Sequence, residues 1–240
     1  MKKYRIGFII CGVVMAVLLA VIALMSVQLW QIHRQQRYYE KKCTAFAVHN
    51  TNAAREQIVF IGDSITDLCK LDDYYGDLPL AVYNRGIGGD TTSGLLARLD
   101  VSLLQIKPAQ VVVMIGTNDI NGGADLQTIL ANYEQILTSI TVSLPDTEVF
   151  VMSVIPQNHD IEKNSAIDVE KTVPKIMDLN VALAQLTHDY DAVTYVDVFS
   201  SLEDNAHFLK PEYSDDGLHL NENGFAVWAN VLIPYLKGQL

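Results

Sequence analysis

The stretch Ile58-Val-Phe-Ile-Gly-Asp-Ser-Ile-Thr66 decides the fold of this chain. Its first four residues are apolar and either β-branched or aromatic, which predicts a buried strand. Gly62 and Asp63 then interrupt the pattern, so that Ser64 stands where the strand gives way to a helix. The unpaired N–H groups of a first helical turn favour negative charge nearby, which suits a nucleophilic hydroxyl. Taken alone, the stretch favours the simpler interpretation that Ser64 or Thr66 is a helix N-cap.

Strand and helix patterns alternate after this stretch. Apolar runs such as 111–115 and 149–152 have no polar face, as expected for parallel strands covered by helices on both sides. We therefore predict an α/β fold, a three-layer α/β/α sandwich around a mainly parallel, flavodoxin-like, five-stranded sheet. The expected strands are 58–61, 80–83, 110–115, 148–155 and 192–196, and the expected helices are 92–105, 125–143, 174–189 and 221–236.

The N-terminal part of the chain has a different character. Residues 6–32 contain no Asp, Glu, Lys or Arg, and this run is long enough to cross a bilayer as one transmembrane helix. We predict an uncleaved anchor in the lipid bilayer rather than a signal peptide, because the run exceeds a usual signal core and no small-x-small site follows it.

The anchor prediction divides the chain into four parts. These are a short tail at 1–5, the anchor at 6–32, a polar stalk at 33–56 with helical character from 31 to 42, and a globular domain at 57–240. Basic residues on both sides of the span nearly balance the positive-inside rule. The very short tail favours a single-pass protein of the cell membrane with its domain on the extracytoplasmic side.

Charge is unevenly distributed along the chain. The formal net charge is −11, and residues 1–42 hold seven Lys or Arg and one Glu, so the remainder carries −17. Such a domain repels phosphate backbones and anionic lipid surfaces, which excludes nucleic acid as a partner and favours a neutral or cationic substrate. The three cysteines are too few for a disulfide framework. Cys43 and Cys69 are either a pair or, by our preferred interpretation, lone thiols.

Four polar clusters follow the predicted strands or precede the last predicted helix. They are 62–64, 84–92, 116–120 and 215–220. Because ligands of such sheets collect outside the carboxyl ends of the strands, we expect the clusters to open onto one edge. The glycine-rich loop at 86–89 either makes a tight turn or leaves a backbone N–H accessible. Asn118 is either an Asx-turn residue or an amide donor for a developing negative charge.

Asp216 and His219 are separated by two residues. This spacing lets a carboxylate orient one nitrogen of an imidazole while the other nitrogen faces a nucleophile. The remaining candidates, His159, His188 and His207, stand outside any such pattern and are interpreted as structural.

Gly-Asp-Ser, Gly-Gly-Asp-Thr-Thr, Gly-Thr-Asn-Asp and Asp-x-x-His occur here in the order seen in the SGNH, or GDSL-type, hydrolases. The chain resembles this family over residues 57–237. The wording at 84–92 and the later Asp-Gly-Leu-His-Leu are most similar to its branch of platelet-activating-factor acetylhydrolase-like and lysophospholipase-like esterases. The polar segment 157–173 departs from the compact family pattern, and we expect it to form a flap or a wall beside the substrate.

The resemblance implies a role for each matching residue. It makes Ser64 the nucleophile, His219 its general base and Asp216 the group that orients His219. The oxyanion hole would consist of the N–H groups of Ser64 and Gly89 and the side-chain amide of Asn118. Gly89 is chosen over Gly88 because it directly precedes the Asp-Thr-Thr of the motif. Asp63 and Asp119 match positions that hold the loops in place.

The function expected from the resemblance is hydrolysis of a carboxylic ester, with no metal or organic cofactor. The expected substrate is a short acyl or acetyl ester of a carbohydrate or other small molecule. A lysophospholipid is the alternative, since the anchor would bring the site near a bilayer. An acetyltransferase with the same three residues and a non-enzymatic binding module remain as rivals. A nucleotide binder is disfavoured because the glycine-rich loop lacks G-x-G-x-x-G or Walker spacing. The oligomeric state is left open.

Overall fold

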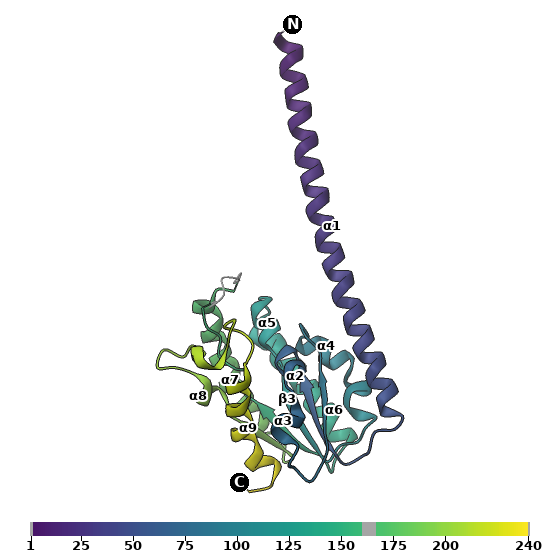
Figure 1. Cartoon of the computed structure of the whole chain (residues 1–240), viewed down its shortest axis with the longest axis vertical. Coiled ribbons are helices and arrows are strands. Elements are labelled where there is room, and N and C mark those ends of the chain that lie inside the picture. The colour runs from purple at the N-terminus through teal and green to yellow at the C-terminus, as the bar shows by residue number, and fades with distance from the viewer. Residues whose placement is uncertain (1, 160–166, 240) are drawn as a thin grey trace. The chain divides into compact units, whose positions relative to one another are not determined.

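The computed structural model describes residues 2–159 and 167–239. The chain forms two compact units, Met1–Thr44 and Ala45–Leu240. Helix α1 (Lys2–Asn50) is continuous, includes both the apolar run at 6–32 and the predicted helical stretch at 31–42, and extends beyond them to Asn50 (Figure 1). By length and composition α1 is able to cross a membrane, a property that it shares with signal sequences. Its large apolar side chains between Met15 and Ile32 are exposed rather than packed in a core.

The second unit is built on a five-stranded sheet in the order β2-β1-β3-β4-β5. Every neighbouring pair is parallel. This is the flavodoxin-like order, and it confirms the predicted fold class. The strands are β1 (Ile58–Gly62), β2 (Val82–Gly86), β3 (Gln110–Met114), β4 (Glu148–Met152) and β5 (Val193–Val196). The limits predicted for the strand at 80–83 were wrong, because β2 begins at Val82 and ends at Gly86. Strand β4 ends three residues before the predicted limit of 155.

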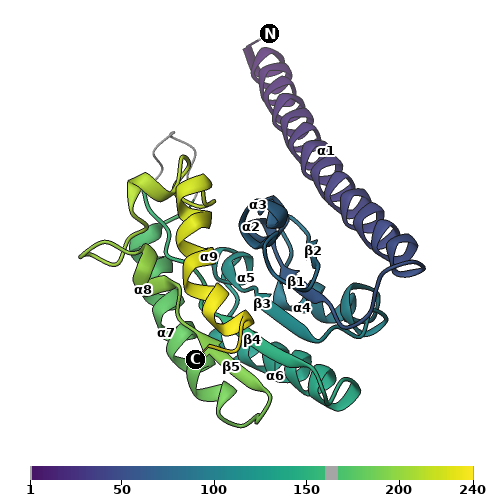
Figure 2. The same ribbon diagram turned by 60° about the horizontal axis from the view of Figure 1, so that its bottom comes forward.

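Alternate residues of each strand face opposite helical layers, which gives the three-layer sandwich (Figure 2). Val59 and Ile61 pack with helices α4, α6 and α7, whereas Ile58 and Phe60 pack with α2, α3 and α9. The helices are α2 (Ser64–Leu68), α3 (Leu71–Tyr75), α4 (Thr92–Ala97), α5 (Thr117–Asn121), α6 (Leu126–Ser143), α7 (Val169–Thr187), α8 (Phe199–Leu202) and α9 (Glu222–Leu236).

Two predicted helices have different limits. The helix expected at 92–105 ends as α4 at Ala97 and is followed by a π-helical turn at Asp100–Leu104. Helix α7 begins at Val169 rather than at Pro174, because buried apolar residues ahead of the proline continue the same face. A helix was expected to begin at Ser64, and α2 confirms it, but the short helices α3, α5 and α8 were not predicted, since segments of five residues or fewer carry no helical periodicity.

Helix α2 crosses the ends of β1 and β2 at very short range. A Cβ atom at Gly86 would lie 2.2 Å from the backbone nitrogen of Asp67, and one at Gly62 would lie 2.2 Å from the carbonyl oxygen of Met114. Both strand ends therefore require glycine. As a result, Ser64 is held directly above the carboxyl edge of the sheet.

The N-cap of α2 is Asp63, so the expectation that Ser64 or Thr66 caps this helix was wrong. Asp63 Oδ1 accepts a hydrogen bond from the N–H of Ile65 at 3.0 Å. Asp63 is only 1% exposed, and among the described residues its Oδ2 has no hydrogen-bond partner. Burial raises the pKa of Asp63 to about 7, against the lowering effect of the Ile65 N–H, while Asp90 and Asp119 raise it further. The folded domain therefore holds a proton here that the unfolded chain releases near pH 4.

We predict that Asp63→Asn changes the pH dependence of stability. A carboxyl group whose pKa is raised by folding stabilises the fold fully below its unfolded pKa and loses that contribution as the pH rises towards 7. Thermal unfolding at pH 5 and pH 8 should show a fall in Tm that is larger for the parent than for Asp63→Asn, by on the order of 5 °C. Asp146→Asn, which alters an exposed carboxylate, is the control. Parallel Tm curves for parent and Asp63→Asn would contradict the assignment.

Candidate active site

The four predicted clusters lie at the carboxyl edge of the sheet. Ser64 begins α2 directly after β1, and Gly89 lies in the loop after β2. Asn118 belongs to α5, which follows β3. Asp216 and His219 lie in the loop before α9. Since parallel strands end at one edge, residues far apart in sequence reach the same surface.

A chain of hydrogen bonds joins Ser64, His219 and Asp216. Ser64 Oγ lies 3.0 Å from Nε2 of His219, a residue 155 positions away in the sequence. Nδ1 of the same imidazole lies 2.7 Å from Asp216 Oδ2. This is the geometry in which a carboxylate fixes the tautomer of an imidazole and the imidazole can accept the proton of a hydroxyl.

The loop that carries this pair is fixed by its own hydrogen bonds. Asp216 Oδ1 accepts from the N–H groups of Leu218 and His219 at 2.9 and 2.7 Å. The Ser214 hydroxyl donates to the His219 carbonyl at 2.7 Å and accepts from the N–H of Gly217 at 2.8 Å. Partial burial raises the pKa of Asp216, but the bonds from His219 and Leu218 outweigh it and hold that pKa below its usual range. Asp216 is therefore ionised at neutral pH.

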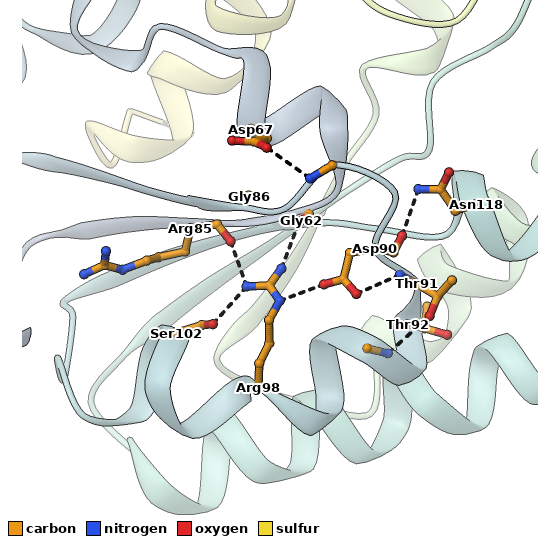
Figure 3. A network of polar contacts seen from close by, with 12 residues as sticks. Gly62, Asp67, Arg85, Gly86, Asp90, Thr91, Thr92, Arg98, Ser102 and Asn118 are labelled. Atoms are coloured by element: carbon orange, nitrogen blue, oxygen red, sulfur yellow. Dashed lines mark hydrogen bonds and ion pairs between the residues drawn. The ribbon is translucent and has the colours of Figure 1, made fainter. Parts of the chain in front are cut away.

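Three candidate N–H donors belong to segments at the same edge of the sheet. Ser64 is the first residue of α2, so its N–H has no acceptor within the helix. The N–H of Gly88 donates to Asp67 Oδ2 at 3.0 Å and is engaged, whereas the N–H of Gly89 has no acceptor within the described part of the chain. One hydrogen of the Asn118 amide donates to the Asp90 carbonyl at 2.8 Å, which leaves the second hydrogen available (Figure 3).

Asp119 ties the loop after β2 to the loop after β3. Its carboxylate accepts hydrogen bonds from the backbone N–H and the hydroxyl of Thr92, the latter at 2.5 Å. Asn132 of α6 donates to the same hydroxyl at 2.9 Å. Asp119 thus joins two loops, and Asp63 caps the helix that carries Ser64.

Two supporting residues, Arg98 and Ser214, were not predicted from the sequence. Arg98 is buried and contacts the ends of two strands, and Ser214 supports the loop of Asp216. A signal for Arg98 was present, because it is the only charged residue in an otherwise apolar run from Leu95 to Leu99. No comparable signal marks Ser214.

A pocket of about 520 Å³ is lined by residues of α2, α3, the start of α9 and the segment 215–223, and none of Ser64, Asp216 and His219 is among its lining residues. Leu68, Tyr74, Leu220 and Phe225 supply its apolar surface. Its charged lining consists of the carboxylates of Asp73, Asp215 and Glu222 and the ammonium group of Lys70. The pocket is therefore amphipathic with an excess of negative charge.

The segment 157–173 was expected to form a flap or a wall. Residues 160–166 lie outside the described residues. Gln157 is buried and accepts a hydrogen bond from the Thr172 hydroxyl at 2.8 Å, while Val169 and Val173 pack in the core as part of α7. Gln157 and Val169 also line a small pocket together with Asp216 and Leu218, so the expectation of a wall beside the substrate stays a prediction.

Comparisons with known proteins agree with this architecture. Residues 60–227 match the model of the GDSL-like lipase/acylhydrolase family. Platelet-activating factor acetylhydrolase IB subunit alpha2 of Gallus gallus is 32% identical over 158 residues, which are 60% of this chain and 67% of the relative. The human alpha2 subunit is 28% identical and covers 70% of this chain and 71% of its own length.

Solved structures give the same result. A protein from Streptococcus pneumonia, described as a platelet activating factor, is 34% identical with a TM-score of 0.81, covering 88% of this chain and 98% of that one. An acetylxylan esterase of Geobacillus stearothermophilus is 21% identical with a TM-score of 0.58, covering 75% of this chain and 94% of its own, and shares the fold.

The match of the family model over most of the globular unit, together with the order of the four motifs, identifies the chain as a member of the GDSL-like lipase/acylhydrolase family and as an ester hydrolase.

Proposed function

We propose that this chain is a membrane-anchored serine esterase that removes a short acyl group, such as acetyl, from a carbohydrate or other small molecule. The observation that carries the proposal is the hydrogen-bond chain from Ser64 Oγ through His219 to Asp216. A serine hydroxyl is a weak nucleophile unless a base lies within hydrogen-bond reach. The 3.0 Å contact with Nε2 of His219 supplies that base.

The reaction proceeds in two steps. Ser64 Oγ attacks the ester carbonyl while His219 takes its proton, and the same proton then passes to the departing alcohol. Water, deprotonated by His219, next attacks the acyl-enzyme, and the acyl–Oγ bond breaks to release the acid while His219 returns that proton to Ser64 Oγ. Asp216 remains ionised and stabilises the imidazolium in both steps.

The negative charge that develops on the carbonyl oxygen needs donors that are already in place. The N–H groups of Ser64 and Gly89 and the free hydrogen of the Asn118 amide are suited to this role. Gly88 is not, because its N–H is engaged by Asp67.

Charge and the relatives' names guide the choice of substrate. The chain beyond residue 42 carries a formal charge of −17, which disfavours an anionic substrate. The relatives are named acetylhydrolases of platelet-activating factor, which supports an acetyl ester. A lysophospholipid remains the second candidate, because exposed apolar side chains along α1 are suited to a bilayer. The same α1 supports a single-pass anchor, and an extracytoplasmic position of the domain is part of the proposal.

We predict that Ser64→Ala lowers kcat for p-nitrophenyl acetate by on the order of 10⁴-fold or more, because no other group can form the acyl-enzyme. Initial rates measured on purified full-length protein in detergent test this. Ser143→Ala, at an exposed serine, is the control and should keep the parent rate. Residual activity above a few per cent in Ser64→Ala would exclude Ser64 as the nucleophile.

We predict that Asn118→Ala lowers kcat by on the order of 10²–10³-fold, because one of the donors to the oxyanion is lost. KM should change far less than kcat, since the donor acts mainly in the transition state. Asn52→Ala, which removes an exposed amide, is the matched control. A parent-like kcat in Asn118→Ala would show that this amide does not face the oxyanion.

We predict that kcat/KM for p-nitrophenyl esters is highest for acetate or butyrate. A short-chain preference follows if the acyl group binds in a small site. A rate that keeps rising beyond octanoate would contradict the short-acyl proposal and favour a lipase-type groove. Product analysis with and without a sugar acceptor separates hydrolysis from acetyl transfer.

A further inference from the structure

Arg98 forms a buried ion pair with Asp90. Its Nε lies 2.7 Å from Asp90 Oδ2, and the two side chains are 1% and 3% exposed. Desolvation is costly for both charges, and truncating one partner would leave the other buried without compensation. A pair of this kind is retained only where its hydrogen bonds are well satisfied.

The remaining donors of Arg98 hold the carboxyl ends of two strands (Figure 3). Nη2 donates to the carbonyl of Gly62 at 2.9 Å, and Nη1 donates to the carbonyl of Arg85 at 2.8 Å and to the Ser102 hydroxyl at 2.9 Å. In the sequence, Gly62 lies two residues before Ser64, and Arg85 lies just before the loop that contains Gly89. One planar guanidinium therefore fixes the starting points of both loops.

Asp90 extends this contact to the third loop. Its carbonyl oxygen accepts the hydrogen bond from Asn118 Nδ2 at 2.8 Å, and its Oδ1 accepts from the N–H of Thr91 at 3.0 Å. Asp90 also follows Gly89 directly in the chain. A shift of Asp90 would therefore move both the Gly89 N–H and the Asn118 amide.

The space for the Asp90 carboxylate is provided by Gly94. A Cβ atom at Gly94 would lie 1.9 Å from Asp90 Oδ1. The Asp90 carboxylate thus occupies the space that the side chain of any residue type other than glycine would fill at position 94. The helix and the ion pair are matched to each other.

We propose that Arg98, through Asp90, is a positioning residue for the oxyanion hole, setting the relative placement of the Ser64 N–H, the Gly89 N–H and the Asn118 amide. The inference rests on the proposed hydrolytic role of these donors. Preorganised donors lose much of their effect when they are displaced by a fraction of an ångström. Lysine cannot replace Arg98, because its single ammonium group cannot reach four acceptors arranged around a planar fork.

The first test is Arg98→Lys, which keeps the charge and removes the fork. Assayed well below its Tm, this variant should show a kcat reduced by about 10–100-fold with KM changed less than about threefold. Thr147→Val is the stability control. It removes a buried hydrogen bond to the Pro108 carbonyl at the opposite edge of the sheet and should lower Tm while leaving kcat unchanged.

A double-mutant cycle separates positioning from a purely structural role. If Arg98 acts through the donors, the double variant with Arg98→Lys and Asn118→Ala should lose less kcat than the two single variants predict together. We expect its fold-loss of kcat to be at least about fivefold smaller than the product of the two single fold-losses. Losses that multiply fully would overturn the proposal. A parent-like kcat in Asn118→Ala alone would instead refute the oxyanion assignment, so the two failures are distinguishable.

Gly94→Ala provides an independent variant that keeps every charge. Alanine in a helix normally stabilises relative to glycine, so a loss of activity here would come from displacement of Asp90. We expect kcat to fall about tenfold or more with KM nearly unchanged. If Arg98→Lys fails to fold, Gly94→Ala tests the proposal by itself. A parent-like kcat in Gly94→Ala would overturn the proposal.

Discussion

The proposed hydrolytic mechanism requires the hydrogen bond between Ser64 Oγ and His219 Nε2. It joins the end of the first strand to the loop before the last helix, and it forms only because parallel strands deliver their loops to one edge. The close crossing of α2 over Gly62 and Gly86 sets the height of Ser64 above the sheet. The internal bonds of the Asp216 loop set the orientation of the imidazole.

The residues at this edge divide into exposed reacting groups and buried supporting groups. The side chains of His219 and Asp216 are 31% and 44% exposed, whereas those of Arg98 and Asp90 are almost fully buried. Substrate must reach the exposed reacting groups, whereas the buried supporting groups must stay in place. Beneath the loops, Arg98 forms its ion pair with Asp90. Burial raises the pKa of Asp63 to about 7, and the nearby carboxylates of Asp90 and Asp119 raise it further.

The sequence was sufficient to predict the sheet, its parallel strands and the clustering of Ser64, Asn118 and His219 at one edge, because apolar runs and motif order carry that information. It was insufficient for β2, which lies two residues later than predicted because Asn84 and Arg85 are polar and yet pair within the sheet. Arg98 was missed for a related reason: the partners of a buried charge are backbone carbonyls from distant strands, and no local pattern announces them. The short helices α3, α5 and α8 were not predicted because segments of five residues or fewer carry no helical periodicity.

The proposed mechanism requires that Ser64 Oγ becomes covalently attached to the acyl group during turnover. Mass spectrometry of the full-length protein after reaction with a fluorophosphonate measures this reactivity, since the reagent labels only a serine activated by a neighbouring base. We expect one adduct, located on the peptide that contains Ser64 and absent when His219 is replaced by alanine. An adduct on a different serine, or an unmodified Ser64 peptide in protein whose esterase activity has been abolished by the reagent, would contradict it.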